Sequence, residues 1–413
     1  TCVKALADAF VPVIKFQYCG IDIDLGMVRM PCESIPPELN ISLEKYLSKM
    51  EDTKDMTCLN GPRVTYELLR RVPNIANFKV LLRAIKLWAR RREIYSNIVG
   101  FPGGVAWGIM AAKVAQVYPN MCPSVLLEKF FSLYKEWNFA DPIIVVPPDE
   151  CQAPSGTERY VLAWDPTRHH FSKRPLTVIT PTYPMANATF NITDSALNVI
   201  RSEIFRASNL TQGISRGENS YSELFAPATF FKLYGNYVQV EVISSEKYLE
   251  SFSGYVESQL RKLVERLTMS ESGLYIAHPC TRHFGPVKAE PCAGEDAYEG
   301  PLQTILFYIG LKFDDALVKA MKESGRGVEL TTPVMEFLSG IQRPDDKQTL
   351  VKIKVVKRRL LPEWVKQEYG SQWKCGVVQS ADHGQREAVK KRTMGELANA
   401  ASNGSMKRLK AET

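Results

Sequence analysis

The sequence contains no apolar run that approaches the roughly 18 residues needed to cross a bilayer, so it predicts no membrane-spanning helix. Its nine cysteines are odd in number and scattered singly, which argues against a disulfide framework and is typical of a reducing compartment. The excess of positive charge is small, with 52 lysines and arginines against 45 aspartates and glutamates. A net charge of +7 permits a polyanionic partner without identifying one.

The glycine-rich stretch "GFPGGVAWG", residues 100–108, lacks the two common phosphate-binding signatures. It matches neither the Walker A pattern nor the Rossmann pattern. Backbone amides of a turn that opens a helix can approach a phosphate or a base closely. Taken alone, the stretch indicates a tight turn rather than a ligand site.

Length and composition are those of a globular protein with several domains. The 413 residues suggest two to three domains, and 45% hydrophobic residues suffice for sizeable cores. Residues 10–30 predict strands, and residues 138–185 predict loops. From about residue 230 a strand-helix-strand-strand alternation predicts a small α+β sandwich.

The segment "QYCGIDIDLGMV" places Asp22 and Asp24 two residues apart on a predicted strand. Alternation puts both carboxylates on one face and Ile21, Ile23 and Leu25 on the other, so we expect a half-buried strand. Two interpretations stay open. Ionised carboxylates on one face supply part of a divalent-metal site, whereas an edge strand simply turns its polar face to water.

The predicted helices of the middle part carry one basic face. We expect a turn at Asn60-Gly61-Pro62 and a long helix from Pro73-Asn74 to about Arg92. On that helix Arg83, Lys86 and Arg90 share a face, opposite an apolar face. A solvated charged surface is the simpler interpretation, and a site for an anionic ligand is the functional one. The apolar face consists of Leu81, Leu82, Ile85, Trp88 and Ala89.

Histidines and cysteines gather once, at His278, Cys280, His283 and Cys292. The two-residue cysteine spacing of a zinc site is missing, which disfavours a metal there.

Read together, four segments resemble the eukaryotic nuclear poly(A) polymerases. The resemblance is strong over residues 9–135 and 175–240 and thins beyond them. The segments are "AFVPVIKFQYCGIDIDLGMVRM", "LNGPRVTYELLRRVPNIANFKVLLRAIKLWARRREIYSNIVGFPGGVAW", "VITPTYPMANATFNI" and "LFAPATFFKLYGNYVQVEV".

The resemblance implies an α+β multidomain chain. Residues 1–58 would be the C-terminal part of a nucleotidyltransferase palm, and residues 59–222 a helical central domain that binds the nucleotide. Residues 223–365 would form an RRM-like RNA-binding domain. The resemblance does not extend to residues 366–413, whose polar and basic composition predicts a flexible tail. No aromatic RNP1 motif is present, so the sequence does not support base stacking on the sheet.

The implied reaction is template-independent polyadenylation in mRNA 3′-end processing. AMP passes from ATP to an RNA 3′-hydroxyl and pyrophosphate leaves, with Mg²⁺ or Mn²⁺ as the two metal ions. In the family three aspartates hold these ions, two in a DxD pair after a Gly-Ser helix and the third in a "GI-x-ID" strand.

"GIDID" matches the third-aspartate strand, so Asp24 is the implied metal ligand and catalytic base. Nothing like the Gly-Ser helix precedes it, and the chain opens on Thr1 with a predicted strand close behind. We therefore expect the DxD pair to lie upstream of Thr1 and this 413-residue chain alone to be inactive.

The resemblance also implies the residues that bind ATP. Lys86 and Tyr95 match contacts to the phosphates, and Asn60 and Asn97 match polar contacts to the nucleotide, with Asn60 near the ribose. The remaining matches are Gly104 and Val105 in the loop that packs on ATP, and Thr180 at the adenine edge.

Two alternatives stay open: a terminal uridylyltransferase, and a non-catalytic RNA-binding or scaffold protein that keeps the fold. The implied partners are an RNA 3′ end or poly(A) and the cleavage and polyadenylation factors, with no membrane partner. Basic clusters at Lys390-Lys391-Arg392 and Lys407-Arg408 are a modest indication of import into the nucleus.

Overall fold

The structure is a computed structural model that describes most of the chain. The described residues are 3–7, 11–35, 39, 44–50, 52–151, 164, 175–269, 273–289, 302–325, 328–342 and 349–375. No helix among them is long and apolar enough to cross a membrane. The chain divides into two compact units, residues 1–358 and 359–413.

A three-stranded antiparallel sheet comes first, in the order β1 (Lys4–Leu6), β2 (Val13–Tyr18) and β3 (Ile21–Leu25). Cys19 and Gly20 join β2 to β3 with φ of 50° and 75°. Two successive left-handed residues make the kind of two-residue turn whose twist suits a hairpin. The register follows, with Lys15 opposite Asp24 and Gln17 opposite Asp22.

The apolar face of β3 differs from the expectation. The sequence predicts a half-buried strand, but Ile21 is 66% exposed and Leu25 is 53% exposed. The alternation itself is present, since Ile23 lies on the same face and the two aspartates on the other. The face is open because none of the described residues covers it.

Helices dominate the described residues between 44 and 233. Those that form the bulk of this part are α2 (Thr53–Arg71), α3 (Ile75–Arg91), α4 (Gly104–Val117), α5 (Pro123–Glu136) and α7 (Asp194–Ser215). Short helical segments are α1 (Glu44–Leu47), η1 (Pro148–Cys151), α8 (Tyr221–Leu224) and α9 (Phe230–Leu233).

Helix α2 corrects the predicted turn at Asn60-Gly61-Pro62, because the helix runs through it without a break. Asp52 caps its start by accepting a hydrogen bond from Lys54 N at 2.8 Å. Buried side chains recur at helical spacing on both sides of Pro62, which keeps the segment helical although proline donates no backbone bond. These side chains are Met56, Leu59, Val64 and Leu68.

Helix α3 confirms the predicted two-faced pattern. Asn74 caps it by accepting from Asn77 N, and its apolar face is buried at Leu81, Ile85, Trp88 and Ala89. Trp88 meets the ring of Phe131 at 4.8 Å in an edge-on arrangement. The basic side chains of α3 are thereby directed away from the core.

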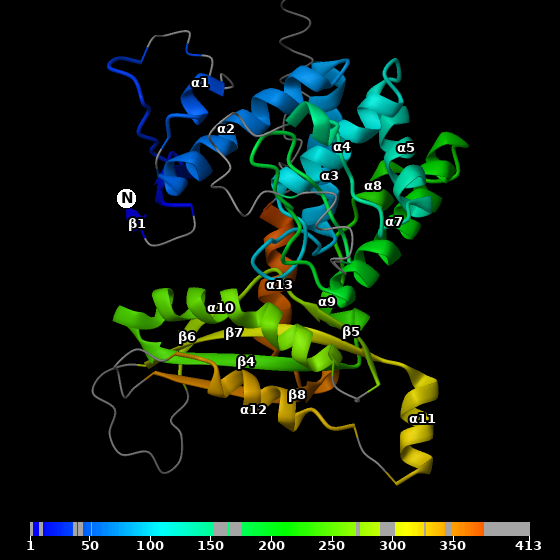
Figure 1. Cartoon of the computed structure of the whole chain (residues 1–413). Helices are drawn as coiled ribbons and strands as arrows, with labels where there is room; N and C mark the ends of the chain where they lie inside the picture. The colour runs from blue at the N-terminus through cyan, green and yellow to red at the C-terminus, as the bar shows by residue number, and fades with distance from the viewer. Residues whose placement is uncertain are drawn as a thin grey trace, which may run out of the picture. The chain divides into compact units, whose positions relative to one another are not determined.

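The second large element is a five-stranded antiparallel sheet in the order β5-β7-β4-β8, with β6 also paired to β7 (Figure 1). Its strands are β4 (Asn236–Ser245), β5 (Leu274–Pro279), β6 (Phe284–Lys288), β7 (Leu302–Phe313) and β8 (Leu350–Lys357). Helix α10 (Glu246–Met269) lies along one face and buries Val256, Leu260 and Leu263 (Figure 1).

Four short elements complete the description. They are α11 (Asp315–Glu323), α12 (Thr331–Ser339), η2 (Arg358–Leu360) and α13 (Glu363–Cys375). Helix α12 packs beside α10. Residues 366–375 of the predicted tail belong to α13, and the rest of that tail lies outside the described residues.

Candidate nucleotide-binding site

The start of helix α4 brings together three of the residues that the sequence singles out. A Cβ atom built on Gly104 would lie 2.7 Å from Tyr95 Oη and 3.3 Å from Lys86 Nζ. The ammonium of α3 and the hydroxyl of the following loop therefore converge on the first residue of α4. The absence of a side chain at residue 104 is what leaves room for both groups.

The first turn of α4 adds backbone donors to this point. Gly103 precedes the helix and offers no side chain to cap it. The first amide groups of a helix have no partner inside the helix and carry the positive end of its dipole. Together with the ammonium of Lys86 they form a positively polarised corner that suits a phosphate.

The ring of Tyr95 is contacted by Arg90, which lies on the same helix as Lys86. The guanidinium carbon of Arg90 lies 4.9 Å from the centre of the Tyr95 ring. A cation over the ring face fixes the ring while its hydroxyl faces Gly104. Helix α3 itself contains no acidic residue that could neutralise these cations.

Asn97 borders the same corner. Its Cβ lies 3.5 Å from the position that a Cβ on Gly103 would take. Its main-chain oxygen accepts a hydrogen bond from Asn191 Nδ2 at 3.2 Å, whereas its buried side-chain oxygen has no partner among the described residues. A buried acceptor without a donor costs about 1–3 kcal/mol, which makes Asn97 a candidate contact for a ligand. Val105 beside it is 49% exposed.

A second group of residues joins helix α2 to the segment around residue 180. Thr182 Oγ1 donates to Asn60 Oδ1 at 2.6 Å, and Arg63 Nη1 donates to the main-chain oxygen of Tyr183 at 2.5 Å. Thr180 is 7% exposed, and its hydroxyl accepts from Ala186 N at 2.9 Å. Burial lowers the pKa of Arg63, which nevertheless stays charged because arginine titrates so high.

The hydrogen bonds of this second group do not extend to Lys86 or Tyr95. The carboxylate of Asp24 forms an ion pair with Lys15, whose Nζ lies 3.8 Å from Asp24 Oδ1. Within the described part of the chain, the hydrogen bonds and short contacts thus form two clusters, and the ion pair of Asp24 belongs to neither. No motif in the sequence marks Arg63 or Thr182, whereas Arg90 lies on the predicted basic face of its helix.

The acidic residues of β3 do not amount to a two-ion metal centre. Asp22 accepts from Gln17 Nε2 at 3.1 Å, and Asp24 faces Lys15 across the hairpin. No group of three or more histidine, cysteine or acidic side chains suited to a metal occurs among the described residues. A pair of ions needs several carboxylates, so the two carboxylates of β3 do not complete such a centre by themselves.

Comparison with known proteins assigns the family. Residues 1–72 match the poly(A) polymerase nucleotidyltransferase domain, residues 77–227 the poly(A) polymerase central domain, and residues 229–300 the domain described as its predicted RNA binding domain. A poly(A) polymerase of Candida albicans, PAPa, is 35% identical over 393 residues, which are 86% of this chain and 68% of that protein. The chain belongs to the poly(A) polymerase family.

Other relatives agree. The Candida albicans poly(A) polymerase PAPalpha is 41% identical over 286 residues, covering 68% of this chain and 50% of that protein. The Dictyostelium discoideum poly(A) polymerase is 35% identical over 368 residues, covering 87% and 43%. The chain thus spans about half the length of these two relatives.

Solved structures are more distant. A structure of a mutant Cid1 poly(U) polymerase bound to MgATP matches with a TM-score of 0.35 and 17% identity. It covers 55% of this chain and 72% of that one. The domain order of the poly(A) polymerase family accounts for the fold described above: a nucleotidyltransferase part, a helical central domain and a C-terminal β-sheet domain.

Proposed function

We propose that this chain is part of an enzyme that transfers AMP from ATP to the 3′-hydroxyl of RNA and releases pyrophosphate. The observation that carries the proposal is the convergence of Lys86 and Tyr95 on Gly104. A cation, a hydroxyl and free helix amides at one point match a triphosphate, because each can donate to an anionic oxygen.

Different residues of the site contact different parts of the nucleotide. Lys86 and Tyr95 hold phosphate oxygens at the first turn of α4, and the unpaired oxygen of Asn97 can accept a hydrogen bond from a hydroxyl or amino group of the nucleotide. Asn60, fixed by Thr182, lies near the ribose, and Thr180 meets the adenine edge with the hydrogen of its hydroxyl. Val105 contributes apolar surface. Selection of ATP follows from these edge and shape contacts in a closed site.

Metal ions supply the activation of the 3′-oxygen when they are bound. In this chain Asp24, which forms an ion pair with Lys15, would provide one carboxylate for Mg²⁺ or Mn²⁺. Because Asp22 and Asp24 belong to no group of three or more potential metal ligands among the described residues, we propose that these 413 residues alone do not catalyse the transfer.

RNA is the second proposed substrate. The match of residues 229–300 to an RNA-binding domain supports an RNA 3′ end or poly(A) as the ligand of the five-stranded sheet. We infer that the protein acts in mRNA 3′-end processing in the nucleus, together with the cleavage and polyadenylation factors. One relative, of Arabidopsis thaliana, is named nuclear poly(A) polymerase 4, which supports that compartment.

ATP binding to the chain tests the proposal. Lys86→Met removes the cation and keeps the length of the side chain, so the affinity for ATP should fall about 10- to 100-fold, as loss of a charge-assisted bond predicts. Lys79→Met is the control, because Lys79 is an exposed lysine of the same helix, about 10 Å along the helix axis from the half-buried Lys86. Its affinity should equal that of the unaltered chain.

Equilibrium dialysis with ATP gives the dissociation constants of all three proteins. Equal affinities for the Lys86→Met and Lys79→Met variants would contradict the proposed site. Tailing assays then decide between functions: metal-dependent tailing by the 413-residue chain would show that it needs no further carboxylates. Incorporation of UTP in place of ATP by the full-length protein would favour a uridylyltransferase, and no incorporation at all a scaffold.

A further inference from the structure

Glu93, in the loop between α3 and Tyr95, is fully buried although its side chain is acidic. It follows Arg92, the residue that ends α3, and has a φ of 58°. A residue with a side chain in this left-handed region costs of order 1 kcal/mol and persists only where its surroundings hold it. The groups that hold Glu93 come from a distant part of the chain, the end of β5, 188 positions away at Thr281.

The carboxylate of Glu93 is bound by the residues that follow β5. Thr281 donates to Glu93 Oε2 from its main-chain nitrogen at 3.2 Å and also from its hydroxyl. Arg282 Nη2 lies 3.0 Å from Oε1, an ion pair that lacks the alignment of a hydrogen bond. The sheet therefore supplies both donors and a balancing positive charge to this buried group.

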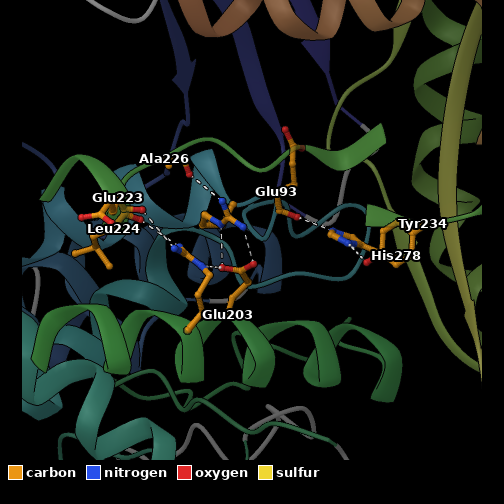
Figure 2. A network of polar contacts seen from close by, with 9 residues as sticks. Glu93, Glu203, Glu223, Leu224, Ala226, Tyr234 and His278 are labelled. Carbon is orange, nitrogen blue, oxygen red and sulfur yellow. Dashed lines mark hydrogen bonds and ion pairs between the residues drawn. The ribbon is translucent and has the colours of Figure 1, made fainter. Parts of the chain in front are cut away.

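The main chain of Glu93 is bound by the same strand. His278 Nε2 lies 3.1 Å from the carbonyl oxygen of Glu93, and His278 Nδ1 lies 2.7 Å from Tyr234 Oη (Figure 2). A carbonyl can only accept, so Nε2 carries the proton and Nδ1 accepts from Tyr234. Complete burial lowers the pKa of His278 to about 4 and keeps this neutral form at physiological pH.

Tyr234 is fixed in its turn by the sheet. A Cβ on Gly310 would lie 2.1 Å from the Tyr234 ring, so only glycine at residue 310 admits the ring at this place. Gly310 of β7 lies opposite His278 in the strand register. The order Gly310, Tyr234, His278, Glu93 is thus a continuous row of packed and hydrogen-bonded groups.

Arg92, the neighbour of Glu93, is also fixed. It forms two hydrogen bonds to Glu203 of α7, each of 2.9 Å, and a third to the carbonyl oxygen of Ala226 (Figure 2). Arg206 donates to the same carboxylate at 2.8 Å. Burial alone would raise the pKa of Glu203, but the bonds and charges of Arg92 and Arg206 outweigh it and hold the pKa below its usual value.

These contacts end two residues before Tyr95. Residues 92 and 93 are therefore tied to α7 and β5, while Tyr95 reaches Gly104 and Asn97 accepts from Asn191. We propose that Glu93 is a positioning residue of the nucleotide site, through which strand β5 of the C-terminal sheet holds Tyr95 against the first turn of α4. This inference rests on the proposed role of Tyr95 in binding ATP.

Two variants of the 413-residue chain test it. Glu93→Gln replaces the carboxylate by an amide of the same shape. Thr281→Val removes the hydroxyl that donates to Glu93. Both should weaken ATP binding about tenfold, within the range typical of coupling between sites, and leave adenosine binding unchanged, because Tyr95 faces the phosphates.

Ser195→Ala is the matched control. Ser195 Oγ is buried and bonds both the nitrogen and the oxygen of Ala277 on β5, each at 2.8 Å. Its loss weakens the contact between α7 and the same strand without touching the loop of residues 92–97. The melting temperature of the Ser195→Ala variant should fall like those of the two test variants, while its affinity for ATP stays equal to that of the unaltered chain.

Each result of these measurements either supports or overturns the inference. A selective loss of ATP affinity in Glu93→Gln and Thr281→Val supports the inference. A loss that follows the melting temperature in all three variants, or no loss in any of them, overturns it. Failure of the proposed function is recognised separately, since Lys86→Met would then bind ATP normally whatever the result for Glu93.

Discussion

Substitution of Gly104 by alanine should disturb the nucleotide site and leave the fold intact. The new methyl group would lie 2.7 Å from Tyr95 Oη and 3.3 Å from Lys86 Nζ, whereas ordinary contacts begin at 3.4 Å. The hydroxyl must therefore move by about 0.7 Å. The backbone of Gly104 is not left-handed, so alanine adds no strain of its own.

The size of the effect follows from the displaced groups. A hydrogen bond to a charged group contributes about 1.5–3 kcal/mol, and each 1.4 kcal/mol is a factor of ten in affinity. Loss of one such bond from Tyr95 predicts a roughly 10- to 100-fold weaker binding of ATP. Stability should change by less than about 1 kcal/mol, because alanine favours a helix while the contact opposes it.

Gly108, one turn further along α4, gives the control. A Cβ there would meet only Leu68 Cδ1 at 3.9 Å and Leu82 Cδ2 at 4.0 Å, which are ordinary contacts. Gly108→Ala should therefore raise the free energy of unfolding by about 1 kcal/mol and leave ATP binding unchanged. Calorimetric titration with ATP and urea unfolding of both variants measure this; unchanged affinity in Gly104→Ala would refute the reasoning.

Three further predictions concern the surrounding contacts. The pKa of His278 is lower in the folded than in the unfolded protein, so His278 should contribute about 3 kcal/mol of stability above pH 6.5 that is lost as the pH falls towards 4. Urea unfolding at several pH values should show this loss in the unaltered chain and not in His278→Gln, and an identical loss in both would contradict the reasoning. Glu203→Gln should lower the free energy of unfolding by about 3–5 kcal/mol in the same assay because it breaks a buried pair, whereas Glu218→Gln, in an exposed pair, should leave that free energy unchanged. Equal effects of the two substitutions would argue against the importance of burial. Thr182→Val should weaken ATP binding about two- to tenfold by freeing Asn60, and a normal dissociation constant would remove Thr182 from the site.

Local sequence patterns predict the parts of the site that lie on one helix. The spacing of apolar residues on α3 places Lys86 opposite the buried face, and Asn74 marks where the helix begins. The hairpin that carries Asp24 follows equally from alternation. In both cases the information is contained within a few turns or a few strand residues.

The contacts between distant segments leave no such pattern. Thr182 bonds Asn60 across 122 positions, and Thr281 bonds Glu93 across 188. The sequence around Glu93 shows only an acidic residue after three arginines, which indicates an exposed charge rather than a buried one.

Helix α2 shows a different limit. Asn60-Gly61-Pro62 is a strong local signal for a turn, yet the buried face formed by Leu59, Val64 and neighbouring apolar residues keeps the segment helical. Packing thus overrides the local preference. The exposed face of β3 is the opposite case, where alternation predicts a buried side that no described residue covers.

A crystal structure of the protein with a non-hydrolysable ATP analogue tests the central claim most directly. The account predicts phosphate oxygens within hydrogen-bonding distance of Lys86 Nζ and Tyr95 Oη, at the first turn of α4. Phosphates bound elsewhere, with both side chains left in solvent, would contradict it.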